Sequence, residues 1–536
     1  MEIRKLLVAN RGEIAARIFR TCDRLGIATV AVAAPGEAAV FHTRRAGEVL
    51  EVPSYLDSGA LVEAASRSGA DALHPGYGFL AENADFAEAV GAAGVRFVGP
   101  SPAAIRAAGD KLEAKRLAAE AGVPVVPTGE PAELGFPLIV KAAAGGGGRG
   151  MRVVRRQEEL DEALEAAGRE AAAGFGDDRV FCERYVERPR HVEIQLLADA
   201  HGTVIHLGER DCSVQRRHQK VLEESPSPAV TPALRAAIGD AAIAFARIVG
   251  YENAGTAEFM LAGDEFFFLE LNARIQVEHP VTELVTGIDL VEQQLRIASG
   301  ERIALEPEPS GHAVEARLYA EDPVTFLPRT GTLKRLRLPE GIRVDQGVEE
   351  GDEVGLAYDP LIAKLIAAGE TREDALDRLG EALRETEVRG VETNLPFLRW
   401  LVAHPALRAG EATTAFLAEN PPLSRPPRVP RPWARPWRLN NGSTPTRTAP
   451  PTVEASAHAE SAGGGQSALK APMPGVVIRV LAGEGDRVAP RQPLVVLEAM
   501  KMETPLVSPY EAVVRRVHVQ EGDRVAGGAL LVELEE

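Results

Sequence analysis

The stretch FFFLELNARIQVEHP, residues 266–280, alternates apolar and polar side chains. In an extended chain this period of two places the polar members on one side, namely Glu270, Asn272, Arg274, Gln276 and Glu278. A solvated strand face would alternate in the same way, but it would not specially explain two carboxylates and an amide, the hard oxygen ligands that Mg²⁺ prefers. Glu258, in AGTAEFM, could lie on a neighbouring strand and complete a set of three metal ligands with Glu270 and Asn272. The stretch therefore predicts a strand that carries a magnesium site.

A glycine-rich loop follows a lysine in LIVKAAAGGGGRGMRVVRR, residues 138–156. Gly145, Gly147 and Gly150 satisfy G-x-G-x-x-G, but a dinucleotide-binding loop should lead into a helix, whereas MRVVRR is typical of a strand. A strand, a glycine loop and a second strand can instead fold over the phosphates of a nucleotide. The pattern G-x-x-x-x-G-K-[ST] does not occur in the chain, so a Walker-type ATPase is excluded. A flexible glycine hairpin without a ligand remains the alternative.

The run ERDCSVQRRHQKVLEE, residues 209–224, concentrates Arg, His and Lys. A nucleic-acid patch is the usual interpretation of such a run. This one is short, lacks aromatic residues and lies in a chain with a formal net charge of −18, so it favours a site for a small anion.

The first 110 residues or so are expected to form an open, doubly wound α/β domain. Residues 3–9 read as a strand, GEIAARIFRTCDRLG as a helix that ends on glycine, and IATVAVAA as a second strand, which implies a parallel sheet. The segment ADALHPGYGFLAENADFAEAV repeats this scheme of strand, glycine-rich turn and helix.

The C-terminal end holds an internal repeat. EGDRV occurs at Glu484–Val488 and again, 37 residues later, at Glu521–Val525, within similar β-branched and leucine-rich surroundings. The repeat predicts two β-units related by a pseudo-twofold axis and packed as a small flattened barrel. Lys501, in LEAMKMETPL, falls between the two halves and is expected at the tip of the hairpin that joins them. It is either an exposed turn residue with methionines as core filler, or an attachment point for a swinging group.

Composition and length predict several soluble domains, since one core seldom exceeds about 250–300 residues and this chain has 536. Residues 421–466 are rich in Pro, then Ser, Thr and Ala, then Gly, and are expected to be a linker. We expect no membrane span and no signal peptide. The three cysteines are widely separated, which fits a cytoplasmic location and predicts neither a disulfide framework nor a zinc site.

Taken together, the motifs resemble biotin carboxylase, an ATP-grasp enzyme, over residues 1 to about 420. The motifs that carry the resemblance, in chain order, are VANRGEIA, HPGYGFLAEN, GDK, KAAAGGGGRGM, RHVEIQ, ERDCSVQRRHQK, LELNARIQVEHPVTE and YDPLIAKL. KAPMPGVV and EAMKM resemble the biotin carrier domain, whose central lysine is biotinylated; lipoyl domains share that fold but usually have Asp-Lys-Ala. The whole chain is similar to the α subunit of acyl-CoA carboxylases.

The resemblance implies a domain organisation: residues 1–112 as a doubly wound N-terminal domain, 113–310 as the ATP-grasp domain and 311–420 as the C-terminal carboxylase domain. The linker of 421–466 and a small all-β carrier domain of 467–536 follow.

The resemblance also implies roles, in a reaction that activates bicarbonate with MgATP through a carboxyphosphate and carboxylates N1′ of biotin. Nucleotide contacts fall on Lys111, Lys141, Gly147, Gly148, Glu183, Arg184, Tyr185, Val186, His191, Gln215 and His218. Metal ligands fall on Glu258, Glu270 and Asn272, and bicarbonate contacts on Lys220, Arg274, Gln276 and the backbone of Val277. Glu278 becomes the general base, Arg343 stabilises the enolate of biotin, and Lys501 carries the biotin.

The implied cofactors are biotin, ATP and Mg²⁺ or Mn²⁺. The implied partners are a carboxyltransferase β subunit, a biotin protein ligase and further copies of the carboxylase part; neither a nucleic acid nor a membrane is expected. The acceptor is expected to be acetyl-CoA or propionyl-CoA, with methylcrotonyl-CoA or pyruvate as alternatives. Two other readings stay open: a different ATP-grasp ligase with a lipoyl-like module, and a carrier scaffold with an inactive N-terminal part.

The chain departs from the family pattern in four places. Ala144 replaces a glycine, Arg184 replaces a more usual lysine, and residues 35–53 are shorter than usual. Residues 421–466 are too short for the folded docking domain of some α subunits. RPPRVPRPWARPWRLN, within that segment, is either a docking remnant or a spacer.

Overall fold

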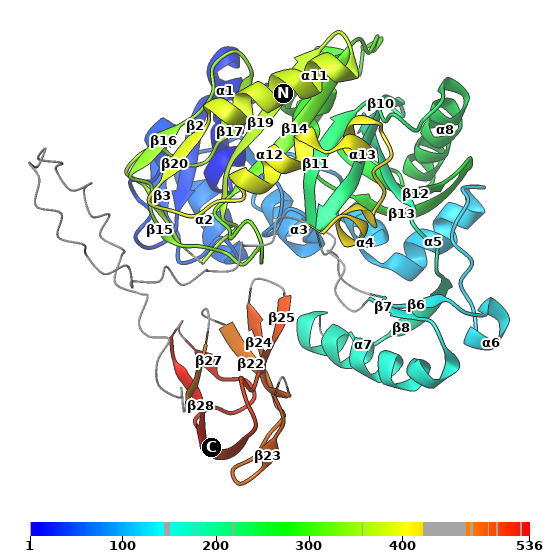
Figure 1. The fold of residues 1–536 in the computed structure, drawn as a ribbon. Coiled ribbons are helices and arrows are strands. Elements are labelled where there is room, and N and C mark those ends of the chain that lie inside the picture. The colour runs from blue at the N-terminus through cyan, green and yellow to red at the C-terminus, as the bar shows by residue number, and fades with distance from the viewer. Residues whose placement is uncertain are drawn as a thin grey trace, which may run out of the picture. The chain divides into compact units, whose positions relative to one another are not determined.

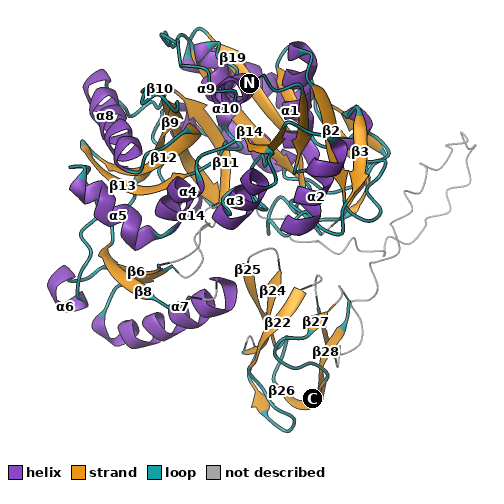
Figure 2. Ribbon diagram, turned by 180° about the vertical axis from the view of Figure 1, so that it is seen from behind, coloured by secondary structure: helices purple, strands orange, loops and turns teal. Residues whose placement is uncertain are grey.

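The structure, a computed structural model, describes residues 2–143, 151–175, 177–216, 219–355, 357–421, 468–471, 475–490, 492–499, 502–525 and 528–535. The chain divides into two compact units. The larger unit comprises residues 1–355 and 360–424, and the smaller unit contains the C-terminal β-domain. Figures 1 and 2 show the elements of each unit from opposite sides.

A five-stranded parallel sheet opens the larger unit, as the βαβ pattern predicts. Its strand order is β3-β2-β1-β4-β5. The strands are β1 (Lys5–Val8), β2 (Ala28–Ala33), β3 (Glu48–Glu51), β4 (Ala72–His74) and β5 (Arg96–Phe97), and the helices are α1 (Gly12–Leu25), α2 (Ser58–Ser68), α3 (Ala84–Ala92) and α4 (Pro102–Gly109). Helix α1 ends where Gly26 adopts the left-handed conformation and donates its N–H to the carbonyls of the last turn.

A small subdomain with its own apolar core follows. Its sheet has the order β7-β6-β8, and helix α7 packs against it (Figure 1). Its elements are α6 (Pro131–Leu134), β6 (Leu138–Ala142), β7 (Arg152–Val154), α7 (Leu160–Phe175) and β8 (Val180–Arg184). Helix α5 (Lys111–Glu120) precedes them and belongs to a different apolar core, through Ala114 and Ala118. Strands β6 and β7 pair antiparallel on either side of the glycine-rich loop, as expected of a hairpin. The expected domain boundary after residue 112 falls within α5.

An eight-stranded sheet forms the centre of the larger unit, in the order β13-β12-β9-β10-β11-β14-β19-β17. The first five strands are β9 (Arg190–Ala198), β10 (Val204–Arg216), β11 (Gln219–Ser225), β12 (Asn253–Ala262) and β13 (Glu265–Asn272). Strand β11 pairs antiparallel with β14 (His312–Tyr319), so one hydrogen-bonded sheet continues across the expected boundary at residue 310. Helices α8 (Pro232–Ile248), α9 (His279–Thr286) and α10 (Leu290–Ala298) lie between the strands in sequence.

The remaining elements of the larger unit follow β14 in sequence. They are β15 (Gly331–Thr332), β16 (Arg335–Arg337), β17 (Arg343–Gln346), β18 (Glu353–Val354), β19 (Leu361–Gly369), α11 (Arg372–Glu385), β20 (Glu387–Arg389), α12 (Leu395–Ala403), α13 (Pro405–Arg408) and α14 (Phe416–Glu419). Helix α11 covers β14 and β19 (Figure 1), and its leucines share a buried core with both strands. Thr371 and Asp374 form a capping box at its start.

The expected extended alternation of residues 266–280 is correct only as far as Asn272, where β13 ends. Residues 273–278 form a bend and a turn instead of strand, and α9 begins at His279. The physical reason lies in the neighbouring residues: pairing with β12 stops at Thr256, opposite Asn272, and Pro280 suits the first turn of a helix, where a missing N–H costs nothing. Glu278 is fully buried at the N-cap of α9 rather than on a strand face.

The C-terminal unit has the pseudo-twofold construction that the repeat predicts. Its strands are β21 (Ala468–Lys470), β22 (Gly475–Val480), β23 (Arg487–Val488), β24 (Pro493–Ala499), β25 (Met502–Val507), β26 (Ala512–Val517), β27 (Arg524–Val525) and β28 (Leu530–Glu535). They form two four-stranded sheets, β21-β28-β26-β23 and β25-β24-β22-β27, around one apolar core.

Each copy of EGDRV contributes its short strand to the other half. Strand β23 of the first half pairs with β26 of the second, and β27 of the second half pairs with β22 of the first. The registers correspond, since Arg487 lies opposite Val513 and Arg524 lies opposite Val476. The exchange ties the two halves together, because neither sheet is complete without a strand from the other half.

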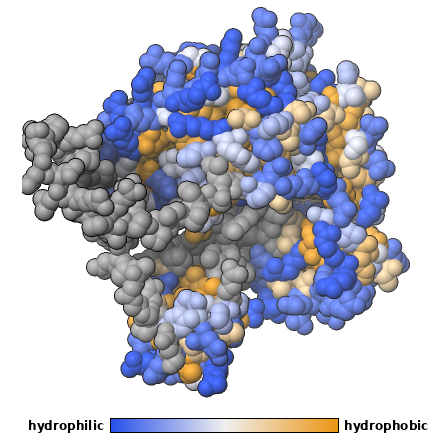
Figure 3. Space-filling view, in the orientation of Figure 1, coloured by the Kyte–Doolittle hydropathy of each residue, from blue (hydrophilic) through white to orange (hydrophobic). Residues whose placement is uncertain are grey.

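On the face drawn in Figure 3, hydrophilic side chains cover much of the larger unit, with smaller apolar patches between them. Within the part of the chain that the structure describes, no helix has the length and apolar character needed to span a bilayer.

Candidate active site

Four charged residues form a row across neighbouring strands of the central sheet. Arg210 on β10 lies directly opposite Glu193 on β9, Glu193 lies opposite Glu258 on β12, and Glu258 lies opposite Glu270 on β13. Opposed residues in an antiparallel sheet share one face, so the four side chains stand side by side. The register thus brings residues from positions 193 to 270 into one polar row.

The ammonium of Lys220, on β11, is the centre of the site. Its Nζ lies 2.5 Å from Glu193 Oε2, 2.8 Å from Glu258 Oε1 and 2.6 Å from Glu278 Oε1. Burial would lower the pKa of Lys220, but the three carboxylates raise it well above its usual value. Lys220 is therefore a fixed positive charge among oxygens that would otherwise repel one another.

Glu278 stands between two cations at the start of α9. Its second oxygen, Oε2, accepts from Arg317 Nη2 at 2.9 Å, while Oε1 accepts from Lys220. Burial would raise the pKa of this carboxyl, but Lys220, Arg317 and Arg210 together hold the pKa well below its usual range. Glu278 is thus ionised at neutral pH and can accept a proton.

The fully buried Arg210 supports this arrangement from within the sheet. Its Nε donates to Glu193 Oε1 at 2.5 Å, and its Nη atoms donate to Gln195, Thr256 and Thr282 at 2.8–3.1 Å. The planar guanidinium therefore joins β9, β10, β12 and α9 through charged and neutral hydrogen bonds.

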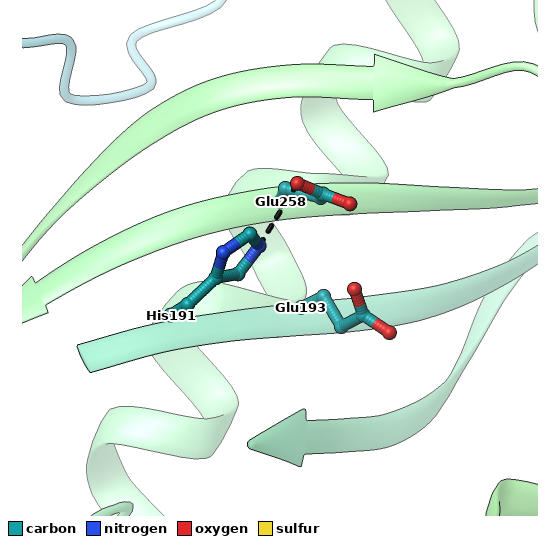
Figure 4. A group of neighbouring side chains, drawn as sticks. All are labelled: His191, Glu193 and Glu258. Carbon is teal, nitrogen blue, oxygen red and sulfur yellow. Dashed lines mark ion pairs between the residues drawn. The ribbon is translucent and has the colours of Figure 1, made fainter. Parts of the chain in front are cut away.

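His191, Glu193 and Glu258 form a compact group on β9 and β12 (Figure 4). His191 Nε2 lies 2.8 Å from Glu258 Oε2, the ion pair drawn in the figure. Burial lowers the pKa of His191, but the charge of Glu258 outweighs it and raises the pKa. On its other side, His191 Nδ1 lies 3.4 Å from the side-chain nitrogen of Gln215.

The three expected metal ligands lie together, and Glu258 is on the neighbouring strand, as predicted. Glu258 and Glu270 face each other across β12 and β13, and Asn272 Nδ2 donates to Glu258 Oε1 at 2.9 Å. Glu270 Oε2 forms only a long ion pair, with Lys111 Nζ at a distance of 4.0 Å, among the described residues. Burial raises the pKa of Glu270, and the adjacent charge of Glu258 raises it further. Glu270 is thus incompletely neutralised, and it lies beside a second carboxylate, Glu258, and the amide of Asn272, a set of groups that fits a divalent cation.

Three lysines converge where the small β6–β8 sheet meets the central sheet. Lys141, at the end of β6, places Nζ 2.6 Å from Glu183 Oε2 on β8. Lys115, on α5, forms an ion pair with the other oxygen of Glu183. Lys111 begins α5, and its N–H donates to the carbonyl of Ala143, the residue after β6, at 3.2 Å. The cluster offers a concentrated positive charge on which the phosphates of a nucleotide could rest.

The segment from Arg184 to Val186 runs from the end of β8. The N–H groups of Arg184 and Tyr185 donate to the carbonyls of Pro127 and Pro137 at 3.0 and 3.2 Å, which fixes the path of the backbone. The guanidinium of Arg184 lies over the ring of Phe267, 5.4 Å from its centroid. Val186 is buried.

The other expected site residues divide into two groups. Arg274 and Gln276 adjoin the metal ligands: Arg274 Nη2 donates to Asn272 Oδ1 at 2.8 Å, and Gln276 Nε2 donates to Glu258 Oε1 at 3.0 Å. Arg343, on β17, is bound instead by Glu283 at 2.7 Å and Asp345 at 2.8 Å, and it lines an open cavity of about 470 Å³ with Arg17, Arg20 and Arg24.

Four expected site residues, Gly147, Gly148, His218 and Lys501, lie outside the described residues. For Lys501, the strands that precede and follow it are described, and Ala499 pairs with Met502.

Sequence reasoning missed Glu193, Arg210, Arg317 and Lys115. A signal existed for Glu193, because it stands between the apolar residues Val192 and Ile194, and a charge that becomes buried there needs a partner. Lys115 sits on an ordinary polar helix and carries no such signal.

Four family comparisons match successive parts of the chain. "Biotin carboxylase, N-terminal domain" matches residues 2–105, and "Carbamoyl-phosphate synthase L chain, ATP binding domain" matches residues 110–306. "Biotin carboxylase C-terminal domain" matches residues 315–419, and "Biotin-requiring enzyme" matches residues 467–534.

Similar proteins match more than three quarters of the chain. The chain is 48% identical over 441 residues to a biotin carboxylase of Halalkalibacterium halodurans, covering 78% of this chain and 98% of that protein. It is 49% identical to the mitochondrial methylcrotonoyl-CoA carboxylase subunit alpha of Oryza sativa, covering 77% of this chain but only 60% of that protein. It is 45% identical to the propionyl-CoA carboxylase alpha chain of Ruegeria pomeroyi, covering 78% and 68%.

A solved structure has the same fold. The biotin carboxylase domain dimer of Hydrogenobacter thermophilus 2-oxoglutarate carboxylase, in complex with MgADP, ADP and bicarbonate, superimposes with a TM-score of 0.77 at 43% identity. The match covers 78% of this chain and 98% of that one.

The geometry predicts that Arg210 is the main structural support of the site. Arg210→Met removes the guanidinium from a fully buried position and leaves the Glu193 carboxylate with one cation fewer, so the free energy of unfolding should fall by roughly 3–5 kcal/mol. Urea unfolding monitored by circular dichroism measures the change. Arg116→Met, on the exposed side of α5, is the matched control and should have no measurable effect. Equal stability of the two variants would show that the guanidinium supports nothing essential.

Proposed function

The chain belongs to the biotin carboxylase family, and we propose that it carboxylates a biotin held on its own Lys501 and supplies the carboxyl group to a separate carboxyltransferase. As a biotin carboxylase with an attached biotin domain, it is an ATP-grasp ligase that uses biotin, ATP and Mg²⁺. The matches to both biotin carboxylase domains and to a biotin-requiring domain leave no basis for the alternative of a different ATP-grasp ligase.

The observation that carries the proposed site is the position of Lys220. Its ammonium lies between the expected base, Glu278, and the expected metal ligand, Glu258, at 2.6 and 2.8 Å. An anion that reacts with the terminal phosphate of ATP has to lie between those two groups. Lys220 already occupies that place and could transfer its hydrogen bonds to bicarbonate.

Bicarbonate would be held from the turn that follows β13. We assign its contacts to Lys220, to Arg274 and Gln276, and to the backbone N–H of Val277. The two cations would offset the negative charge that bicarbonate and phosphate share in the transition state. Glu258, Glu270 and Asn272 would hold Mg²⁺, which supplies further positive charge to the phosphate oxygens when bound.

Glu278 would remove the proton from bicarbonate. With Lys220 and Arg317 both donating to it, its pKa lies well below the usual range, so it is a weak base in the arrangement described. When Lys220 turns toward bicarbonate, one of the two donors leaves, and the pKa of Glu278 should rise toward a value suited to a base. Binding of the anion would thus activate the group that deprotonates it.

Nucleotide contacts are assigned to the lysine cluster and to the β8 segment. The residues are Lys111, Lys141, Glu183, Arg184, Tyr185, Val186, His191 and Gln215, with Gly147, Gly148 and His218 in the stretches outside the described residues. Lys115 belongs beside them, because it supplies Glu183 with a second cation. Glu183 therefore stays neutralised if Lys141 moves to the phosphates.

Arg343 would place positive charge next to the ureido group of biotin. It lines an open cavity, and Glu283 and Asp345 hold its guanidinium. Within the proposal the partners are bicarbonate, a biotin protein ligase that modifies Lys501, a carboxyltransferase β subunit and further copies of the carboxylase part.

The acceptor is proposed to be acetyl-CoA or propionyl-CoA, in keeping with the likeness to the propionyl-CoA carboxylase alpha chain. Methylcrotonoyl-CoA is a second candidate, because the similarity to a methylcrotonoyl-CoA carboxylase subunit is at least as high. The pocket that selects the acceptor would belong to the carboxyltransferase.

Glu278→Gln should abolish bicarbonate-dependent ATP hydrolysis. The change keeps the shape of the side chain and removes the base, so the bicarbonate-dependent rate with free biotin should fall by about 10²–10⁴-fold, while the KM for ATP stays within about twofold. Release of ADP at varied bicarbonate measures both quantities, and Glu120→Gln, exposed on α5, is the control. A loss of ATP affinity would instead make Glu278 a metal ligand or a structural residue. A wild-type chain without bicarbonate-dependent hydrolysis would favour an inactive scaffold.

Lys501→Arg should eliminate biotin from the chain. Avidin blotting and intact-mass measurement of the protein from its native source should show biotin on the wild type and none on the variant. Lys470→Arg, at an exposed position of β21, is the matched control, and this variant should keep the biotin. A wild type without biotin, or a lipoyl group in its place, would contradict the assignment.

The complex purified from its native source should carboxylate acetyl-CoA or propionyl-CoA with a higher kcat/KM than methylcrotonoyl-CoA or pyruvate. Incorporation of labelled bicarbonate into a panel of acceptors measures the ranking. A preference for methylcrotonoyl-CoA would replace the first candidate with the second.

A further inference from the structure

Three sequence motifs have no role in the chemistry proposed above, and the structure brings them together at one buried lysine. Lys364 belongs to YDPLIAKL and lies in β19, Glu13 belongs to VANRGEIA and lies in α1, and Tyr77 belongs to HPGYGFLAEN. Lys364 is fully buried, and the residues on either side of it, Ala363 and Leu365, are buried and apolar. An ammonium in such surroundings requires a specific reason.

The ammonium of Lys364 contacts the turn that holds the proposed bicarbonate contacts. Its Nζ donates to the backbone carbonyl of Val277 at 2.9 Å and lies 3.1 Å from Glu13 Oε2. Glu13 in turn accepts a hydrogen bond from the hydroxyl of Tyr77. Asp345 lies 3.9 Å from the same ammonium and binds Arg343 at 2.8 Å. One buried cation therefore adjoins both the bicarbonate turn and the carboxylate that orients Arg343.

The contact with Val277 orients a specific part of the backbone. The turn of residues 273–278 lies outside the ladder hydrogen bonds of β13 and precedes α9, so regular secondary structure does not fix its peptide planes. The carbonyl of Val277 belongs to the planar peptide that ends at the N atom of Glu278. Holding that carbonyl therefore places the N and Cα atoms of Glu278, from which its side chain extends.

Packing alone does not explain the lysine. A buried ammonium beside two buried carboxylates stabilises a fold no better than apolar residues of similar volume in many cases, so such a group is weak support for a purely structural role. Burial raises the pKa of Glu13, and Lys364 opposes this effect. Burying this ion pair is thus costly. The Lys364 ammonium nevertheless donates a charge-assisted hydrogen bond to the turn that ends at Glu278.

We infer that Lys364 is a positioning residue for bicarbonate: anchored by Glu13 and Tyr77, it holds the Val277 peptide so that Glu278 and the backbone of the turn face the anion. The inference rests on the proposed function, because it assumes that bicarbonate binds at this turn. Lys364 itself touches neither substrate, and nucleotide binding at the β6–β8 lysines does not depend on it.

The test uses the full-length chain and the double variant Glu13→Gln/Lys364→Met. Removing both members of the ion pair avoids leaving Glu13 as an unpaired buried charge, while Val277 still loses its donor. The KM for bicarbonate, in ATP hydrolysis with free biotin, should rise roughly tenfold to hundredfold, the range for loss of one charge-assisted hydrogen bond. The KM for ATP should stay within about twofold of the wild-type value. Lys334→Met, on an exposed lysine, is the control and should leave every parameter unchanged.

The outcomes separate this inference from the proposed function. A wild-type chain without bicarbonate-dependent hydrolysis contradicts the proposed function, and the inference with it. A folded double variant with the wild-type KM for bicarbonate, or with equal losses for ATP and bicarbonate, overturns the inference and leaves the function intact. If the double variant does not fold, Glu13→Gln alone decides: it loosens the anchor, so the KM for bicarbonate should rise at least about threefold, and an unchanged value overturns the inference.

Discussion

The site depends on one constraint: carboxylates buried in the central sheet remain charged only if a cation lies among them. Lys220 meets this requirement for Glu193, Glu258 and Glu278 at 2.5–2.8 Å, and Arg210 and Arg317 support two of those carboxylates from the other side. Without these cations the carboxylates would take up protons, because isolated buried charges are expensive. The charge pattern is therefore a condition for the fold of the site as well as for its chemistry.

The continuous eight-stranded sheet is what makes this pattern possible. Its strand order places β9, β10 and β12 side by side, so directly opposed positions carry Arg210, Glu193 and Glu258. The pairing of β11 with β14 adds Arg317 from the part of the chain that the sequence assigns to a separate domain. The proposed active site therefore depends on the pairing of β11, in the ATP-grasp part, with β14, in the C-terminal part. It also depends on the N-terminal helix α1, because Lys364 on β19 forms an ion pair with Glu13 of that helix.

The C-terminal β-domain, whose strands lie between Ala468 and Glu535, faces a different physical problem, that of forming a stable core from a short stretch of chain. Small domains bury little apolar surface, so extra constraints are valuable. Here the two halves exchange the short strands β23 and β27, so each sheet is complete only when both halves are folded. Strands β24 and β25, which precede and follow Lys501 in sequence, pair with each other. Both belong to a unit that has its own apolar core.

Much of the fold followed from patterns within short stretches of sequence, because those patterns are caused locally. The βαβ opening, the hairpin around the glycine loop, the repeat at 37-residue spacing and the adjacency of Glu258 to Glu270 all follow from periodicity, turn chemistry and strand pairing. The sequence also indicated the family, and with it most of the residues that surround Lys220.

Tertiary structure alone decided which distant charges meet. The alternation of residues 266–280 predicted a single strand, but β13 ends at Asn272 because its partner strand ends its pairing there, and the turn buries Glu278. Arg210, Arg317 and Lys115 carry no local mark of their roles, since each acts through a partner distant in sequence that sheet register and helix packing bring near. Lys364 stands out only as a lone charge between apolar residues, and its partner Glu13 is likewise set by packing. Local sequence determines periodicity and turn conformation, whereas the meeting of buried charges is settled only when long-range strand pairing brings their side chains within hydrogen-bond distance.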